Sequence, residues 1–219
     1  MKNLLASLLA TFLVVGTATG QEDYNPQDPK AKEILENLSA KNKKYTSIKA
    51  NFEYRMQNEA ADIDETQKGI VWLKGDKYRV ELDGVERVSD GKTNYTYLTE
   101  EDELQITSAE NEEEGGMMKP SEIMNIHEQG FKYKYIGTKT IDGKTLEYIE
   151  LYPEKADKPF HTIELYIDKA KTQIYMINVK SKNGNVFTYK LDNYQTNLNI
   201  PDSKFNFDKS KAGDVIDLR

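Results

Sequence analysis

The chain has 219 residues, contains no cysteine, and carries a formal net charge of −7 at pH 7. Without thiols it can form no disulfide and no lipid anchor attached through a cysteine, and its two histidines are too few for a typical zinc site. The acidic balance argues against binding of nucleic acid or of anionic lipid as the main function, because both need a basic surface.

The first twenty residues have the three parts of a secretory signal peptide. Lys2 supplies a positive charge, residues 4–15 are apolar apart from one serine and one threonine, and residues 18–20 are small. An apolar stretch of this length is too short for a membrane anchor. We therefore expect cleavage near Gly20-Gln21, export to the periplasm, and a single domain formed by residues 21–219.

A short amphipathic helix is predicted to follow this leader. Asp28 is suited to cap a helix, and Pro29 is suited to its first position. Apolar residues then recur at the spacing of one helix face, namely Ala31, Ile34, Leu35 and Leu38. We expect this helix to end at about Asn42.

From Tyr45 onward apolar and polar residues alternate, which is the pattern of half-buried strands. The first strand presents Ile48, Ala50, Phe52, Tyr54 and Met56 on one face. Further strands are expected at 70–73, 78–82, 95–97, 104–106, 131–135, 146–151, 163–167, 174–179 and 186–191. Pairs of glycine with aspartate or asparagine separate many of them and suit tight hairpins. Roughly ten strands in hairpin order favour a meandering antiparallel sheet.

Residues 108–129 interrupt this strand pattern. The segment 108–118 is acidic, then glycine-rich, and ends on two methionines, whereas residues 119–129 contain a proline near a predicted helix start. We predict a mobile loop that leads into a short apolar lid helix. Flexible thioethers beside a glycine hinge suit a surface that grips irregular apolar partners. The alternative is a helix that plugs one end of a closed core.

The sequence lacks the motifs of the common enzyme classes. It contains no HExxH, GxxxxGK[ST], GxGxxG or GxSxG pattern. We therefore expect no catalytic residues, no metal and no cofactor. If an enzyme used an apolar hollow here, Glu122 and Glu128 would be the nominal acid–base candidates. The acidic runs 100–103 and 110–114 are interpreted as solvated loops, with docking to a basic partner or loose calcium binding as their alternatives.

Four segments together carry a family resemblance. YTSIKANFEYRM (residues 45–56) is similar to a first strand of the form S-h-x-A-x-F-x-Q, and GIVWLKGDKYRVEL (69–82) is similar to a G-x-h-W-h-K-x-P hairpin. VSDGKTNYTY (88–97) is similar to V-S-D-G-K-T-h-W-x-Y and is the most specific of the four. FNFDKSKAGDVIDLR (205–219) resembles a closing F-x-F-x-P-P-x-G-V strand. On these segments the chain resembles the outer-membrane lipoprotein carrier (LolA) family of Gram-negative bacteria.

The resemblance implies a mainly β (α+β) fold, an incomplete antiparallel β-barrel of about ten or eleven strands with an N-terminal helix and a short lid helix. It implies a monomeric, non-enzymatic periplasmic carrier that holds the acyl chains of lipoproteins in an apolar cavity. Such a carrier accepts lipoproteins from an inner-membrane ABC-type exporter and delivers them to an outer-membrane acceptor. The alternative is a periplasmic lipid- or lipoprotein-sensing regulatory protein of the same fold.

One departure from the family concerns the latch of the lid. Better-known carriers place an arginine and then a proline after the W-h-K triplet, and the arginine helps to hold the lid. Gly75 and Asp76 occupy those positions here. The latch must therefore be different, absent, or supplied by a neighbour such as Arg79.

The candidate lipid-binding residues come from the apolar faces of the early strands and from the lid. Alternation alone does not say which face is concave, and Trp72 could lie on either. Each candidate also has an ordinary core role as its alternative. The candidates are Phe52, Tyr54, Met56, Trp72, Tyr78, Val80, Leu82, Tyr95, Tyr97, Met117, Met118, Ile123, Met124 and Ile126.

Overall fold

The N-terminal helix begins and ends where the sequence predicts. The structure is a computed structural model, and it describes residues 27–111, 120 and 130–219. Helix α1 (Pro29–Asn42) is capped by Asp28, whose Oδ1 accepts hydrogen bonds from the backbone N–H groups of Lys30 and Ala31 at 2.8 and 3.3 Å. These contacts satisfy donors that have no partner within the helix. The predicted signal peptide and lid fall outside the described residues.

The strands form one sheet, and most of them lie where alternation predicts. They are β1 (Ile48–Asn58), β2 (Ile63–Lys74), β3 (Lys77–Leu82), β4 (Val85–Ser89), β5 (Thr93–Leu98), β6 (Glu103–Ser108), β7 (Phe131–Ile141), β8 (Lys144–Pro153), β9 (Phe160–Asp168), β10 (Gln173–Ser181), β11 (Val186–Thr196) and β12 (Asp214–Asp217). Short 3₁₀ turns η1 (Glu59–Ala61), η2 (Ala109–Asn111), η4 (Asp202–Phe205) and η5 (Lys209–Lys211) lie between them.

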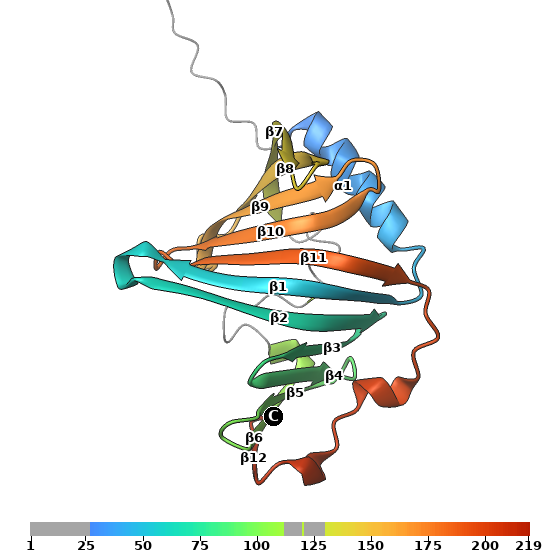
Figure 1. Cartoon of the computed structure of the whole chain (residues 1–219), viewed down its shortest axis with the longest axis vertical. Coiled ribbons are helices and arrows are strands. Elements are labelled where there is room, and N and C mark those ends of the chain that lie inside the picture. Colours follow the sequence, from blue (N-terminus) through green and yellow to red (C-terminus); the bar gives the residue numbers. More distant parts are fainter. Residues whose placement is uncertain (1–26, 112–119, 121–129) are drawn as a thin grey trace, which may run out of the picture.

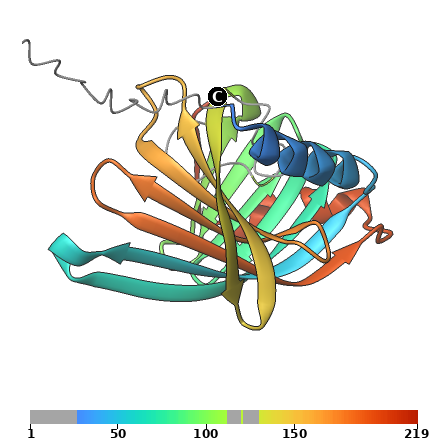
Figure 2. The same cartoon turned by 90° about the horizontal axis from the view of Figure 1, so that it is seen from above.

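Strand β1 lies in the middle of the sheet, between two meanders. The strand order is β12-β6-β5-β4-β3-β2-β1-β11-β10-β9-β8-β7. Strand β1 pairs antiparallel with β2 on one side and with β11 on the other, where Tyr54 lies opposite Tyr189. The sheet is curved and strongly twisted but stays open, with β12 and β7 as its edges (Figures 1 and 2). The predicted incomplete antiparallel barrel is confirmed.

Two of the twelve strands in the described part of the chain are not marked by alternation. Strand β4 is short, and its two valines lie three positions apart, so a period of two does not reveal it. Strand β12 pairs in parallel with β6, with Val215 opposite Leu104. No hairpin turn precedes a parallel strand of this kind, so turn signals do not reveal it either.

The face of the sheet that packs against α1 is called the helix face. A buried cluster joins Ala31, Leu35 and other α1 residues to β7–β10, with Leu165 and Ile177 fully enclosed. The start of the helix is tied to the edge strand, because Asp28 Oδ2 accepts a hydrogen bond from the backbone N–H of Tyr135 at 3.1 Å. Because every second residue of a strand faces the same way, this face continues across β11 and β1 to β3.

The opposite face of β2 to β6 is covered by the C-terminal segment, residues 197–213. Phe205 packs with Trp72 of β2, and Phe207 packs with a second cluster on β4 to β6. Lys204 Nζ lies 3.8 Å from the centroid of the Trp72 ring, a cation–π contact. Figure 1 shows this segment in red, running beside β3 to β6.

Candidate functional site

The helix face carries a band of aromatic side chains at its centre. Tyr54 of β1 stacks with Phe187 of β11 at 6.2 Å between ring centroids and 12° between ring planes. It also packs against Tyr189 at 5.3 Å and 45°. Phe52 of β1 and the partly buried Leu82 of β3 extend the band across β2, where Gly69 lies between them. An aromatic and aliphatic surface therefore spans β11, β1, β2 and β3.

A glycine makes room for the Phe52 ring over β2. Gly69 of β2 is opposite Phe52, and a Cβ atom placed on it would lie 2.7 Å from Cζ of that ring. The same Cβ atom would lie 2.5 Å from the backbone oxygen of Glu81. Only a residue without a side chain fits between them, which is a common reason for glycine inside a strand.

This aromatic band is only partly buried, unlike the core beneath α1. Leu151, Ile163 and Leu165 are fully buried, whereas Tyr54 and Tyr189 keep accessible surface. Burial nevertheless raises the pKa of the Tyr189 hydroxyl, and the neighbouring Tyr54 raises it further. Burial, followed by Glu65, likewise raises the pKa of Tyr54. Both phenols stay neutral at physiological pH, so the rings of the band carry no charge, and the charged Arg87 and Glu65 lie at its border.

Six of the predicted lipid-binding residues lie together on this helix face. They are Phe52, Tyr54, Met56, Tyr78, Val80 and Leu82. Val80 lies opposite Arg87 of β4, and Tyr95 of β5 lies opposite Val88, the next residue of β4. Consecutive residues of a strand face opposite ways. Tyr95 therefore faces the other way.

Three predicted residues lie on the opposite face instead. Trp72, Tyr95 and Tyr97 pack beneath the C-terminal segment, where Tyr95 stacks with Phe207 at 6.3 Å and 16°. They do not share a surface with Phe52 or Tyr54. The five predicted lid residues, Met117, Met118, Ile123, Met124 and Ile126, lie outside the described part of the chain.

Strand β11 supplies residues that the sequence did not single out. Phe187, Tyr189 and Leu191 lie opposite Met56, Tyr54 and Phe52, and all three also touch the cluster beneath α1. Their alternation was visible, but the pairing of β11 with β1 joins distant parts of the chain. No local signal reveals such a pairing.

Arg79, the candidate for an altered latch, also lies on the opposite face. Its Nε lies 2.7 Å from Glu81 Oε1, and its Nη2 lies 2.5 Å from Glu86 Oε1. Its Nη1 donates to the backbone oxygen of Lys204 at 3.2 Å. These contacts fasten the C-terminal segment to β3 and β4. Arg79 therefore lies on the face away from the aromatic band.

A separate groove of about 430 Å³ crosses the opposite face at β2, β1 and β11. Its lining is mostly polar, with two lysines and two carboxylates. The lining residues are Asn51, Phe52, Glu53, Lys68, Gly69, Ile70, Lys190 and Asp192. Its mixed charge does not suit an acyl chain.

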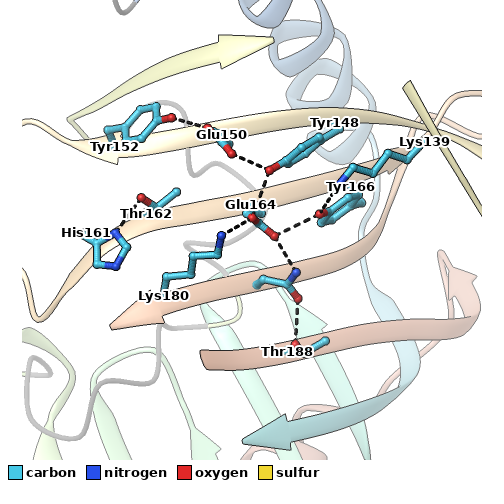
Figure 3. A network of polar contacts seen from close by, with 11 residues as sticks. Lys139, Tyr148, Glu150, Tyr152, His161, Thr162, Glu164, Tyr166, Lys180 and Thr188 are labelled. Atoms are coloured by element: carbon cyan, nitrogen blue, oxygen red, sulfur yellow. Dashed lines mark hydrogen bonds and ion pairs between the residues drawn. The ribbon is translucent and has the colours of Figure 1, made fainter. Parts of the chain in front are cut away.

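Figure 3 shows a polar network on the opposite face of β8 to β11. Glu164 of β9 accepts hydrogen bonds from the Tyr166 hydroxyl at 3.1 Å and from Asn178 at 2.8 Å, and it pairs with Lys180 Nζ at 2.5 Å. The Tyr148 ring stacks on Tyr166 at 4.8 Å and 4°. The carboxylate is therefore surrounded by donors from two neighbouring strands.

The protonation states in this network favour a structural role. Burial alone would raise the pKa of Glu164, but the hydrogen bonds from Lys180 and Asn178 outweigh it and lower the pKa. Burial, aided by Glu164, raises the pKa of Tyr166. At neutral pH the carboxylate is ionised and the phenol is protonated, so neither is poised to exchange a proton. We interpret the network as support for the strands.

The described residues contain no group of three or more His, Cys, Asp or Glu side chains placed to hold a metal ion. Among the helices in that part of the chain, none is long and apolar enough to cross a membrane.

Comparisons with known proteins identify relatives of this chain. A curated but uncharacterized protein of Methanocaldococcus jannaschii is 27% identical over 203 residues, which cover 91% of this chain and 57% of that protein. The chain therefore spans little more than half the length of that relative.

Among solved structures, an uncharacterized conserved protein of Thermus thermophilus matches with a TM-score of 0.56 and 18% identity, covering 86% of this chain and 99% of that one. A LolA superfamily protein of Nitrosomonas europaea matches with a TM-score of 0.42 and 13% identity, covering 81% and 97% of the two chains. The likeness to the Thermus protein concerns the fold.

The comparison with protein families is the most direct. The model of the outer membrane lipoprotein carrier protein LolA matches residues 43–208, from the end of α1 to the start of η5. This range includes β1 to β11, and with them the aromatic band of the helix face. The chain belongs to the LolA family.

Proposed function

We propose that this protein is a periplasmic carrier that holds the acyl chains of lipoproteins against the aromatic band of its helix face. The observation that supports this most directly is the partial burial of Tyr54, Phe187 and Tyr189, which lie side by side on the helix face. A soluble carrier needs such a surface, because apolar groups that were fully packed could not take up a chain.

The energetics of a lipid anchor favour a broad and adaptable surface. Each buried methylene contributes about 0.8 kcal/mol, so three acyl chains prefer a membrane over water by roughly 30 kcal/mol. A carrier must replace most of this burial and still release its cargo. Aromatic rings offer large contact areas with few rotatable bonds, which suits chains of variable position.

The proposed lining consists of the partly buried Tyr54, Met56 and Leu82 together with Phe187, Tyr189 and Leu191, and the buried Phe52, Tyr78 and Val80 support it from within the core. The five methionine and isoleucine residues of the predicted lid remain part of the proposal. In this function residues 1–20 direct export, and residues 21–219 act as one carrier unit. An inner-membrane ABC-type exporter would load the carrier, and an outer-membrane acceptor would unload it.

The proposal is tested by release of lipoproteins from spheroplasts. Purified protein is added to spheroplasts that retain labelled lipoproteins, and the supernatant is examined for a soluble complex. The carrier function predicts release by the wild-type protein. Failure of the wild-type protein to form any soluble complex would contradict it.

Two tyrosines form a matched pair for this assay. Tyr54 stacks on Phe187 at 6.2 Å and 12° on the helix face, and Tyr95 stacks on Phe207 at 6.3 Å and 16° on the opposite face. Loss of one ring from the apolar contact is worth about 1–2 kcal/mol, so Tyr54→Ser should reduce release roughly 5- to 30-fold. Tyr95→Ser should leave release unchanged once both variants are shown to be folded by urea unfolding. Equal losses would contradict the assignment of the surface.

A further inference from the structure

Three elements meet at one end of the strands. They are the C-terminal end of α1, the β7–β8 turn and the β9–β10 turn. Lys41 Nζ donates a hydrogen bond to the backbone oxygen of Lys171, and the backbone N–H of Lys169 donates to the oxygen of Thr145 at 3.1 Å. Figure 1 shows the β9–β10 turn beside α1. Three segments that are distant in sequence thus form one continuous surface.

This surface, the lysine end, is basic although the protein is acidic. It has seven lysines, namely Lys41, Lys43, Lys44, Lys139, Lys144, Lys169 and Lys171. Its carboxylates are Asp142, Glu147 and Asp168, so its formal charge is +4 in a chain whose net charge is −7. On the adjoining strand β11, Lys190 and Asp192 cancel each other. Most of these lysines are exposed.

The tip of the β1–β2 hairpin is acidic instead. Glu59, Asp62, Asp64 and Glu65 lie there with one arginine, Arg55, which pairs with Asp64 at 2.6 Å. Figures 1 and 2 show this tip and the end of α1 on opposite sides of the molecule. The charge distribution is therefore asymmetric, and an anionic surface would attract the lysine end and repel the hairpin tip.

Aromatic residues of the helix face reach the lysine end. Tyr45 follows α1, and Tyr194 lies near the end of β11, with 6.5 Å between their ring centroids. Both are partly exposed and contact the same apolar cluster as Phe52. Tyrosine and lysine together are typical of membrane interfaces, because each has an apolar body and a polar tip.

We propose that the lysine end docks this protein, in one orientation, on the anionic phospholipid headgroups of a bilayer surface. Each lysine near such a surface strengthens binding roughly fivefold, and the attraction fades within a Debye length. Flexible lysines spread over three turns suit a fluid layer of headgroups better than a single rigid partner. This inference goes beyond cargo binding, because it assigns a membrane-contact surface.

The test is sedimentation of the purified protein with lipid vesicles at low salt. Vesicles that contain phosphatidylglycerol should bind the protein, vesicles of phosphatidylcholine alone should not, and high salt should release it. Equal binding to both kinds of vesicle, or to neither, would overturn the proposal. Binding of soluble polyglutamate as tight as that of the anionic vesicles would assign the surface to an acidic protein and would overturn it as well.

Two double charge-reversal variants distinguish the effect of charge at the lysine end from the effect of the protein's net charge. Lys44 and Lys171 are exposed at the lysine end, whereas Lys155 and Lys182 are exposed beyond the other ends of β8 to β10. Both double variants change the net charge by the same amount. K44E/K171E should bind anionic vesicles at least about tenfold more weakly, and K155E/K182E should bind within about twofold of the wild-type protein. Equal weakening of both pairs would overturn the proposal.

Uptake of a fluorescent fatty acid distinguishes this proposal from the carrier function. K44E/K171E should take up the probe as well as the wild-type protein, since neither lysine belongs to the aromatic band. If the wild-type protein takes up the probe but fails to bind anionic vesicles, only the docking proposal fails. If it binds the vesicles but fails to take up the probe, only the carrier function fails.

Discussion

Replacement of Gly69 by alanine tests the packing of the helix face most directly. The added Cβ would lie 2.7 and 2.8 Å from two atoms of the Phe52 ring and 2.5 Å from the Glu81 backbone oxygen. Carbon atoms in contact normally lie 3.5–4.0 Å apart, so the ring or the strand must move. Phe52 is buried among Val71 and Val80, which leaves it little room.

The expected result is a loss of about 1–3 kcal/mol in the free energy of unfolding, as for other overpacked cores. In a chain of this size that loss corresponds to a fall of roughly 3–10 °C in Tm. The direction is informative, because Gly→Ala in an uncrowded strand stabilises by about 0.5–1 kcal/mol. Urea and thermal unfolding measure both quantities. An unchanged or raised Tm would refute the placement of the Phe52 ring over Gly69.

A double-mutant cycle identifies the source of this loss. In a Phe52→Ala background the ring contacts are gone, and only the contact with the Glu81 oxygen remains. Gly69→Ala should therefore cost clearly less there than in the wild-type protein. An equal cost in both backgrounds would attribute the whole effect to the backbone contact.

Two further predictions concern polar contacts. Glu164→Gln should destabilise the protein by about 2 kcal/mol at pH 7, because the ion pair with Lys180 is lost in a buried setting. The lowered pKa of Glu164 means that its stabilisation is present above the unfolded pKa of about 4.3 and is lost as the pH falls through the folded value. Urea unfolding should show the stabilities of the two proteins converging as the pH falls below the unfolded pKa, and a constant difference would contradict this assignment. Asp28→Ala should cost about 1–2 kcal/mol, because it removes the cap of α1 and the bond to Tyr135, whereas Asp28→Asn keeps an acceptor and should cost less. Thermal unfolding followed by circular dichroism would reveal equal losses, which would argue against the capping role.

The elements that the sequence predicted well are those with local causes. Asp28 and Pro29 mark the start of α1, and alternation marks the long strands because one of their faces is buried. Strand β4 lacked this signal because its valines do not alternate. Local chemistry therefore accounted for most elements but not for their partners.

The face that each strand presents depends on the loops between strands. Asp90 shapes the β4–β5 loop, since its Oδ1 accepts hydrogen bonds from the backbone N–H groups of Lys92 and Thr93 at 2.8 Å each. The resulting register places Ser89 opposite Asn94, and with it Tyr95 on the face opposite Tyr54. A loop one residue longer or shorter would reverse that face. Alternation within each strand does not record such a reversal between strands, so it grouped Tyr95 with the helix-face residues.

Net charge likewise concealed the distribution of charge. The value of −7 argued against anionic lipid, yet the fold brings Lys44, Lys144 and Lys171 to one end of the molecule. These residues come from three separate turns, and no run of the sequence contains them together. Only the tertiary arrangement reveals a basic surface of this kind.

The central position of β1 also has a consequence for how the chain assembles. The β2–β6 and β7–β11 meanders can form from hairpins that are local in the sequence. Strand β1, however, also pairs with β11, which lies near the far end of the chain. Closing so long a loop is slow, so this pairing is expected to limit the folding rate. Because a chain is made from its N-terminus, β1 keeps one hydrogen-bonding edge unpaired until β11 has been made, and other chains can pair with that edge in the meantime.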